Sequence, residues 1–301
     1  MGQENLHYPA LLSKIKELAE QNTIILAWLD NGYFPVFRIW YYFFKQHNLK
    51  NILVFSLDAG VERKLNALGV PTYRIDRAYT SKREIWGGRP AIVREIIASG
   101  TNVMQTDIDA FWLKNITDIV YNSPHDLSIS IAYGIPKEIV QKWGFTLCCG
   151  FYFLRSNART KAFLDESEFT SRSQKVGSDQ SGMNWTLFNN GITWSLQEST
   201  NNQGYLKKYD MQIEAISTAL ISRHADEDGE KEVYIYHPAL KGLDGYEKVA
   251  DAIKKLTRLE VSDKQLSAFY TQRFVDKDYW SSQAIRLGKK GYKKLKRTLM
   301  R

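Results

Sequence analysis

The sequence predicts an α/β protein, with a mixed sheet flanked by helices and a basic helical tail at the C-terminal end. Short apolar runs alternate with helical patterns through the first half of the chain, and several of the apolar runs are hydrophobic at nearly every position. Such runs are typical of parallel strands that helices cover on both faces. With 301 residues, of which 44% are hydrophobic, the chain can also bury a large core.

In the first half, the elements follow one another in a regular order. A first helix is predicted because five apolar residues share one helical face: Leu11, Leu12, Ile15, Leu18 and Ala19. The run Thr23-Ile-Ile-Leu-Ala-Trp-Leu29 predicts a buried strand, and Asp30-Asn31-Gly32 predicts the turn that ends it. Strands are then predicted over 51–57, 71–75 and 101–106, and helices over 35–47, 61–68 and 90–99. Gly69 and Gly100 are suitable C-caps for the last two helices.

The second half is less regular and favours a mixed sheet with some antiparallel strands. Strands are predicted over 127–132, 147–154, 192–196 and 233–236, and helices over 157–166, 179–189 and 245–258. The polar stretch 200–229 supports no assignment. We therefore predict a main domain over residues 1–260 and a helical extension with a basic tail over 261–301.

Composition excludes several classes of protein. The two cysteines, Cys148 and Cys149, are adjacent and provide neither a disulfide framework nor zinc-ligand spacing, which favours a reducing compartment. No apolar run reaches the roughly 18–20 residues that span a bilayer, and the N-terminus lacks the pattern of a signal peptide. We therefore expect a cytoplasmic protein in which the sequons at Asn115 and Asn184 are unused.

The positive charge is concentrated in the tail. The chain has a formal net charge of +8, and residues 286–301 carry eight Lys or Arg and no acid, so the remaining 33 basic and 33 acidic residues balance. This distribution excludes a uniformly basic nucleic-acid binder. Ile285, Tyr292, Leu295 and Leu299 share one helical face, which predicts that residues 285–301 dock on an anionic membrane surface, making the protein peripheral on the inner face. A solvated, frayed tail is the alternative, since Gly288 and Gly291 weaken the helix.

The strongest local signal is Asp107-Ile-Asp109, which follows a buried strand and precedes an aromatic run. Ligands of open α/β sheets bind at the carboxyl ends of strands, and hard divalent cations prefer carboxylate oxygens. A metal site is therefore predicted, with helix capping as the alternative. Two further pairs, Asp226/Asp228 and Asp276/Asp278, lie in polar surroundings typical of solvated loops.

Four segments in order resemble the nucleotide-diphospho-sugar transferase family of GT-A glycosyltransferases, and the resemblance spans about residues 30 to 250, most of the chain. They are residues 87–113 around the Asp-x-Asp pair, Cys149-Gly-Phe-Tyr-Phe-Leu-Arg-Ser156, Ser178-Asp-Gln-Ser181 and Tyr236-His-Pro-Ala-Leu-Lys-Gly242. The resemblance implies a GT-A Rossmann-like domain, a nucleotide-sugar donor (UDP-sugars first), a divalent metal (Mn²⁺ before Mg²⁺) and often retention of anomeric configuration. The acceptor would be a hydroxyl of a glycan or of a lipid-linked glycan, as in polysaccharide biosynthesis.

The resemblance also assigns roles around the donor diphosphate. Asp107 and Asp109 would bind the metal, and Asp107 the donor as well, while His237 would complete the metal shell. Lys241 and Gly242 would lie near the diphosphate. The alternative for His237 is an ordinary buried histidine, and the alternative for Lys241 is a surface lysine.

Other roles concern the base and the reacting sugar. Asp30, Asn31 and Gly32 would dock the base and ribose, and Arg89 would face the donor. Asp179 and Gln180 would lie beside the reacting sugar, with Asp179 as the base if the enzyme inverts. The alternatives are an ordinary turn for residues 30–32, a surface position for Arg89, and a helix cap for Ser178 or Asp179. Cys149 is expected to pack, and Gly150 to permit close backbone approach.

Two departures from the family pattern, at Asn115-Ile116 and around Cys149, leave every metal ligand in place. Two competing functions stay open. One is a metal-dependent phosphohydrolase, although that chemistry usually has Thr or Val where this chain has Phe111. The other is a non-catalytic protein that binds a membrane surface.

Overall fold

The computed structural model describes residues 9–75, 82–173, 177–196, 201–223, 233–238, 240, 252 and 255–256. The chain divides into two compact units, Met1–Ala239 and Leu240–Arg301, and every element described below belongs to the first. Most of the predicted helix over 245–258 and the whole tail over 285–301 lie outside the described residues. The boundary predicted after residue 260 stays a prediction.

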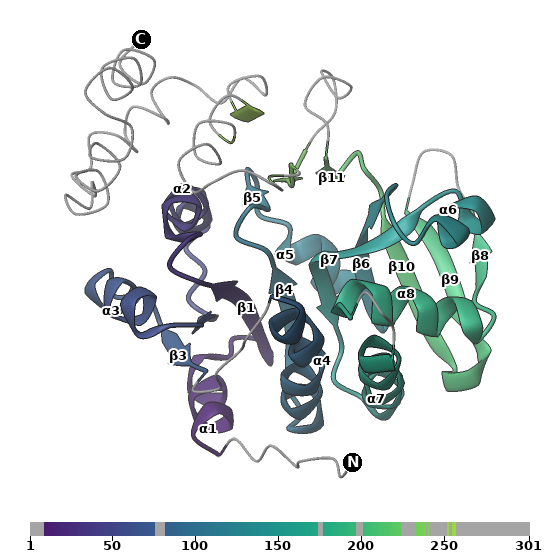
Figure 1. Ribbon diagram of the computed structural model, residues 1–301, viewed down its shortest axis with the longest axis horizontal. Helices are drawn as coiled ribbons and strands as arrows, with labels where there is room; N and C mark the ends of the chain where they lie inside the picture. Colours follow the sequence, from purple (N-terminus) through teal and green to yellow (C-terminus); the bar gives the residue numbers. More distant parts are fainter. Residues whose placement is uncertain are drawn as a thin grey trace. The chain divides into compact units, whose positions relative to one another are not determined.

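A nine-stranded mixed sheet forms the centre of the first unit, in the order β3-β2-β1-β4-β7-β6-β10-β9-β8 (Figure 1). Strands β1 to β4 are parallel, β7 runs antiparallel between β4 and β6, β10 is parallel to β6, and β9 and β8 are antiparallel additions. The bounds are β1 Thr23–Leu29, β2 Ile52–Ser56, β3 Thr72–Arg74, β4 Asn102–Thr106, β6 Leu127–Ala132, β7 Thr146–Leu154, β8 Thr193–Ser195, β9 Asn202–Leu206 and β10 Met211–Ile216. The predicted mixed α/β sheet is confirmed.

A second sheet consists of three short strands in the order β11-β12-β5. β5 (Phe111–Trp112) pairs antiparallel with β12 (Ile235–Tyr236), which pairs parallel with β11 (Ile221–Ser222). These six residues are all buried. The small sheet therefore fixes the chain directly after Asp109 beside the chain directly before His237.

Helices cover the main sheet, with α4, α7 and α8 side by side against β4 and β7 (Figure 1). The α-helices are α1 Pro9–Leu18, α2 Phe34–Phe44, α3 Ala59–Ala67, α4 Lys82–Ala98, α5 Thr117–Asn122, α6 Lys137–Trp143, α7 Ala158–Ser173 and α8 Asp179–Asn189, with 3₁₀ turns at Lys45–His47 and Lys207–Tyr209. Among the described residues, no helix is long and apolar enough to cross a bilayer.

Several predicted boundaries were wrong, for physical reasons. α4 begins at Lys82 instead of residue 90, so Pro90 lies inside the helix. α7 continues to Ser173 because Ser167 and Ser171, in a stretch that reads as polar, are buried in the helix. The unassigned stretch 200–229 contains β9, β10 and β11.

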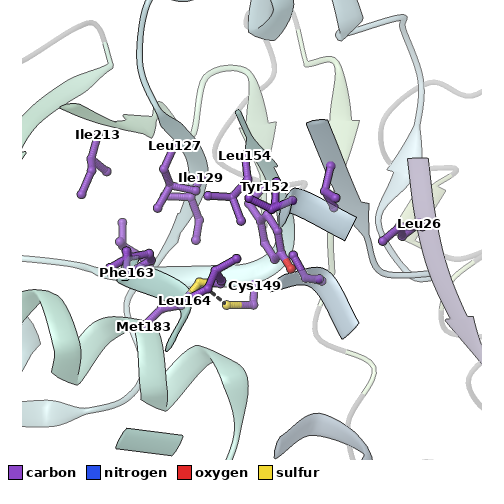
Figure 2. Packing of buried hydrophobic residues seen from close by; sticks show 14 of the residues in the cluster. Leu26, Leu127, Ile129, Cys149, Tyr152, Leu154, Phe163, Leu164, Met183 and Ile213 are labelled. Carbon is purple, nitrogen blue, oxygen red and sulfur yellow. Dashed lines mark hydrogen bonds between the residues drawn. The ribbon is translucent and has the colours of Figure 1, made fainter. Parts of the chain in front are cut away.

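Strand β7 lies at the centre of the core and is buried at all nine positions. Figure 2 shows its residues Cys149, Tyr152 and Leu154 among side chains from neighbouring strands and helices. The Cys149 thiol lies 3.6 Å from the sulfur of Met183, and both cysteines are free, as predicted. Cys149 is therefore a packing residue.

Two stretches rich in aromatic residues, Tyr33 to Phe44 and Trp185 to Trp194, also contribute to the core. Phe37 and Trp40 of α2 are fully buried, and Phe44 contacts Trp112 of β5 with ring centroids 5.2 Å apart. Near the other end of the sheet, Trp194 packs on Trp143 at 5.6 Å. Asn184 is also fully buried. Its amide oxygen accepts from the Leu147 N–H and its amide nitrogen donates to the Leu147 carbonyl, so this asparagine has a structural role.

Gly182 permits the close contact between α8 and α7, and this contact gives a test of the packing. A Cβ at position 182 would lie 2.5 Å from the carbonyl oxygen of Ser167 and 2.8 Å from the Cβ of Ser171. We expect Gly182→Ala to lower the free energy of unfolding by about 1–3 kcal/mol, measured by urea titration, because the helices must separate. Gly134→Ala is the control, since nothing lies within 4 Å of its Cβ position. Equal stability of the two variants would contradict the packing.

Candidate metal and donor site

Asp107 and Asp109 lie in a tight turn between β4 and β5, at the carboxyl edge of the parallel strands. The Asp107 N–H donates to the carbonyl of Gly150 on β7 at 2.7 Å, and the Ala110 N–H donates back to the Asp107 carbonyl at 3.0 Å. Below the turn, the buried indole of Trp112 donates to the hydroxyl of Thr106 at 3.1 Å. These bonds fix the backbone of the turn, and both carboxylates stay partly accessible while Ile108 between them is buried.

His237 completes a three-residue cluster with the two aspartates. It follows β12, and its N–H donates to the Ser222 carbonyl of β11 at 2.8 Å. Its Nε2 lies 3.3 Å from Oδ1 of Asp109, and one potential ligand atom from each of Asp107, Asp109 and His237 lies within 4.8 Å of the others. Two carboxylates and one imidazole form a donor set that suits a divalent cation such as Mn²⁺.

Gly150 provides the space that His237 occupies. A Cβ at this position would lie 2.0 Å from Cε1 and 2.7 Å from Nδ1 of the imidazole. Gly150 belongs to β7, whose pairing with β6 is irregular at this level. Its expected role, close approach, is confirmed, although the group that approaches is a side chain of the same chain.

Arg89 of α4 is buried between two carboxylates. Its Nη1 lies 3.1 Å from Oδ1 of Asp107, and its Nη2 lies 2.6 Å from Oδ2 of Asp179. The guanidinium also lies 4.5 Å from the ring centroid of Trp86. Burial lowers the pKa of Arg89, but the two carboxylates outweigh it and keep the group charged. Arg89 therefore links the metal cluster to the first turn of α8.

Asp179 is the first residue of α8, and Ser178 caps the helix through its hydroxyl, which accepts from the Ser181 N–H at 3.2 Å. The alternative of a helix cap is therefore confirmed for Ser178, whereas the Asp179 carboxylate forms an ion pair with Arg89. Burial raises the pKa of Asp179, as does Asp107, and Arg89 opposes both. The side-chain amide of Gln180 makes no hydrogen bond within the described part of the chain, so it is available to a substrate.

The turn after β1 is held by hydrogen bonds within its own neighbourhood. Oδ1 of Asp30 accepts from the Tyr33 N–H at 2.8 Å, and Asn31 is held by Asp58 and Lys64 at 2.8 and 3.0 Å. Burial raises the pKa of the Tyr33 phenol, and so do Asp109, Asp107 and Asp30. Tyr33, which was not predicted for the site, therefore lies within electrostatic range of both carboxylates.

A second layer behind His237 contains Cys148 and Arg223, neither of which was predicted for the site. Nη1 of Arg223 donates to the Cys148 sulfur at 3.0 Å and lies 3.1 Å from Nδ1 of His237. Burial raises the pKa of Cys148, but His237 and Arg223 outweigh it and lower the pKa to about 7. Burial lowers the pKa of His237, while Asp109 and Cys148 raise it to about 10.

Five of the predicted site residues contact one another in this region, namely Asp107, Asp109, His237, Arg89 and Asp179, and Gln180 follows Asp179 in α8. The turn Asp30-Asn31-Gly32 contacts Tyr33, Asp58 and Lys64 instead, and its role stays a prediction. Lys241 and Gly242 lie outside the described residues, as do the pairs Asp226/Asp228 and Asp276/Asp278. Sequence order alone could not indicate that Arg89 joins Asp107 to Asp179.

Comparison with known proteins gives a family match over more than half of the chain. A model of the family described as nucleotide-diphospho-sugar transferase matches residues 47–240, which include most of the cluster. A UDP-galactose:fucoside alpha-3-galactosyltransferase from Dictyostelium discoideum is 32% identical over 88 residues. That stretch covers 28% of this chain and 13% of the length of the relative.

Solved structures give more distant matches. The galactosyltransferase LgtC, in complex with donor and acceptor sugar analogues, is 14% identical, with a TM-score of 0.45 over 81% of this chain and 99% of that chain. Mouse xyloside xylosyltransferase 1 in its apo form is 10% identical, with a TM-score of 0.43 over 71% of this chain and 97% of that chain. These scores are too low to support an argument about individual residues.

Gly150 offers a test of the cluster that changes no ligand. We expect Gly150→Ala to weaken Mn²⁺ binding by roughly tenfold or more, because the added methyl group displaces the imidazole of His237. Mn²⁺ affinity is measured from the electron paramagnetic resonance signal of the free ion, with Gly134→Ala as the control. Unchanged affinity in a folded Gly150→Ala protein would show that His237 is not a ligand.

Proposed function

The chain belongs to the nucleotide-diphospho-sugar transferase family and is a glycosyltransferase, and on this basis we propose that it transfers a sugar from a UDP-sugar in a reaction that needs a divalent cation. The observation that supports the metal requirement most strongly is the convergence of Asp107, Asp109 and His237 at the carboxyl edge of the sheet. UDP-galactose is the first donor to test, because the relative from Dictyostelium discoideum is named for it. The acceptor is a hydroxyl of a glycan or a lipid-linked glycan.

The three residues of the cluster would hold the cation. Their mixed oxygen and nitrogen donors favour Mn²⁺, with Mg²⁺ as the second choice, because Mg²⁺ prefers an all-oxygen shell. A cation bound there would neutralise charge on the departing nucleoside diphosphate as a Lewis acid. Asp107 would also contact the donor, and its ion pair with Arg89 fixes the orientation of its carboxylate.

The remainder of the donor would extend from this cluster toward the turn after β1. Asp30, Asn31 and Gly32 would hold the base and ribose, and the Tyr33 phenol, close to Asp107 and Asp109, would border the same space. Lys241 and Gly242 would contact the diphosphate. Arg89 acts differently from the sequence-based expectation: because both of its terminal nitrogens bind carboxylates, we propose that it positions Asp107 and Asp179.

We propose retention of anomeric configuration, because Asp179 is poorly placed to act as a base. Its Oδ1 accepts from the Gln180 N–H at 2.9 Å and its Oδ2 is paired with Arg89. In the retaining reaction, the bond from the anomeric carbon to the phosphate oxygen breaks and the acceptor oxygen bonds to the same face. The acceptor proton passes to the leaving phosphate. Gln180, whose amide is available, would lie beside the oxocarbenium-like centre.

Neither competing function has support from the site. Phe111, two residues after Asp109, is fully buried in β5 and provides no group for phosphate hydrolysis. Docking of residues 285–301 on an anionic membrane would suit a lipid-linked acceptor and a peripheral location, and it stays a prediction.

The metal role of Asp109 can be tested without knowing the acceptor, because slow hydrolysis of the donor also releases UDP. We expect Asp109→Ala to reduce Mn²⁺-dependent release of UDP from UDP-galactose by roughly 100-fold or more, through loss of a metal ligand. The matched control, Asp118→Ala, removes an exposed aspartate of α5. Wild-type rates in a folded Asp109→Ala protein would contradict the assignment, and a panel of other UDP-sugars extends the test if UDP-galactose is not a donor.

A further inference from the structure

Arg223 is placed beside the metal cluster by the register of the small sheet. Ser222 of β11 is paired with Tyr236 of β12 in parallel, so the next residue of each strand, Arg223 and His237, lies at the same carboxyl end. The two side chains meet there, with Nη1 of Arg223 3.1 Å from Nδ1 of His237. Arg223 therefore reaches the cluster from the side opposite to Asp109, which contacts Nε2 of the same imidazole.

The guanidinium of Arg223 has few partners for its charge. Its described contacts are the sulfur of Cys148 and Nδ1 of His237, and both involve Nη1. Within the described ranges, no carboxylate lies within ion-pair distance of it, whereas Arg89 binds two carboxylates. Arg223 is also only partly buried, while Arg89 is 4% exposed. The donors on Nε and Nη2 of Arg223 are thus left for another acceptor.

Neither contact satisfies the guanidinium of Arg223 well. A thiol sulfur is a weak acceptor and an imidazole nitrogen offers one lone pair at most, whereas the planar fork of a guanidinium carries five N–H donors. A partner with several oxygens would therefore suit Arg223 better than Cys148 or His237.

We propose that Arg223 binds a phosphate oxygen of the donor diphosphate through its donors on Nε and Nη2. The inference rests on the proposed function, because it needs a nucleoside diphosphate at the cluster. A phosphate group suits the available donors, since the planar guanidinium can give two parallel hydrogen bonds to its oxygens. Arg223 also places a positive charge beside His237, the predicted metal ligand, where it can compensate the charge of an incoming anion.

Two binding measurements on Arg223→Ala test this role, and their expected signs are opposite. We expect the affinity for UDP at saturating Mn²⁺ to fall by roughly tenfold or more, because a charge-assisted hydrogen bond is lost. We expect the affinity for Mn²⁺ alone to stay the same or to rise, because a nearby positive charge is removed. Arg223→Lys keeps the charge without the planar fork and should fall between Arg223→Ala and the wild type for UDP.

Isothermal titration calorimetry measures UDP binding, and the resonance signal of free Mn²⁺ measures the cation. Lys161→Ala, which removes an exposed surface cation of α7, is the matched control. Uridine, which lacks the phosphates, should bind wild type and Arg223→Ala equally well, whereas equal losses for uridine and UDP would contradict a phosphate contact.

The remaining outcomes separate this inference from the proposed function. Weaker binding of both Mn²⁺ and UDP would overturn it, because Arg223 would then only hold His237 in place. Unchanged UDP affinity in Arg223→Ala and Arg223→Lys would overturn it while the proposed function stands. A wild-type protein that binds Mn²⁺ but no nucleoside diphosphate would overturn the proposed function and this inference together.

Discussion

Arg89 holds two carboxylates from distant segments of the chain, and the geometry of the site depends on that buried guanidinium. Asp107 follows β4 and Asp179 begins α8, and both contact Arg89 of α4. Without Arg89, the buried Asp179 would lie near Asp107 with no opposing charge, and burial would favour its protonated form. Breaking such a buried pair by removing one partner typically costs about 3–5 kcal/mol. Arg89 therefore permits three carboxylates to lie close together at one edge of the sheet.

The mixed topology brings the remaining groups to that edge. Because β7 runs antiparallel beside β4, its Gly150 lies next to Asp107, and the absence of a side chain there leaves the space that His237 fills. The small sheet then fixes the approach of His237 from residues far along the chain, since β12 pairs with β5 directly after Asp109. A cation held between the tight turn and the residue after β12 would add a further link to the pairing of β5 with β12. Arg223 enters through the same sheet, which places a second guanidinium beside the imidazole.

Much of the parallel half of the sheet and the metal turn could be predicted from sequence, because each depends on local patterns. Buried parallel strands are apolar throughout, and Asp107 and Asp109 stand out after such a strand. β9 and β10 were missed because they contain polar residues: Gln212 is exposed, and Glu214 is buried with hydrogen bonds from Ser128 and Asn201. The pairing of Arg89 with Asp179, and of Arg223 with His237, depends on tertiary contacts and on strand register, which no local pattern encodes. Tyr33 was missed because its neighbours Asp107 and Asp109 come from another strand.

If Asp107, Asp109 and His237 hold a cation that in turn binds a nucleoside diphosphate, thermal unfolding of the wild-type protein must depend on both ligands. The measurement uses UDP, GDP, CDP and dTDP, each in Mn²⁺ and in EDTA. A ligand at about 100 times its dissociation constant adds roughly 2.7 kcal/mol to the stability of the folded state, which raises the midpoint measurably. We expect a rise with UDP that EDTA abolishes and that the other three nucleotides do not match. No rise with any nucleotide, or a rise with UDP that persists in EDTA, would contradict it.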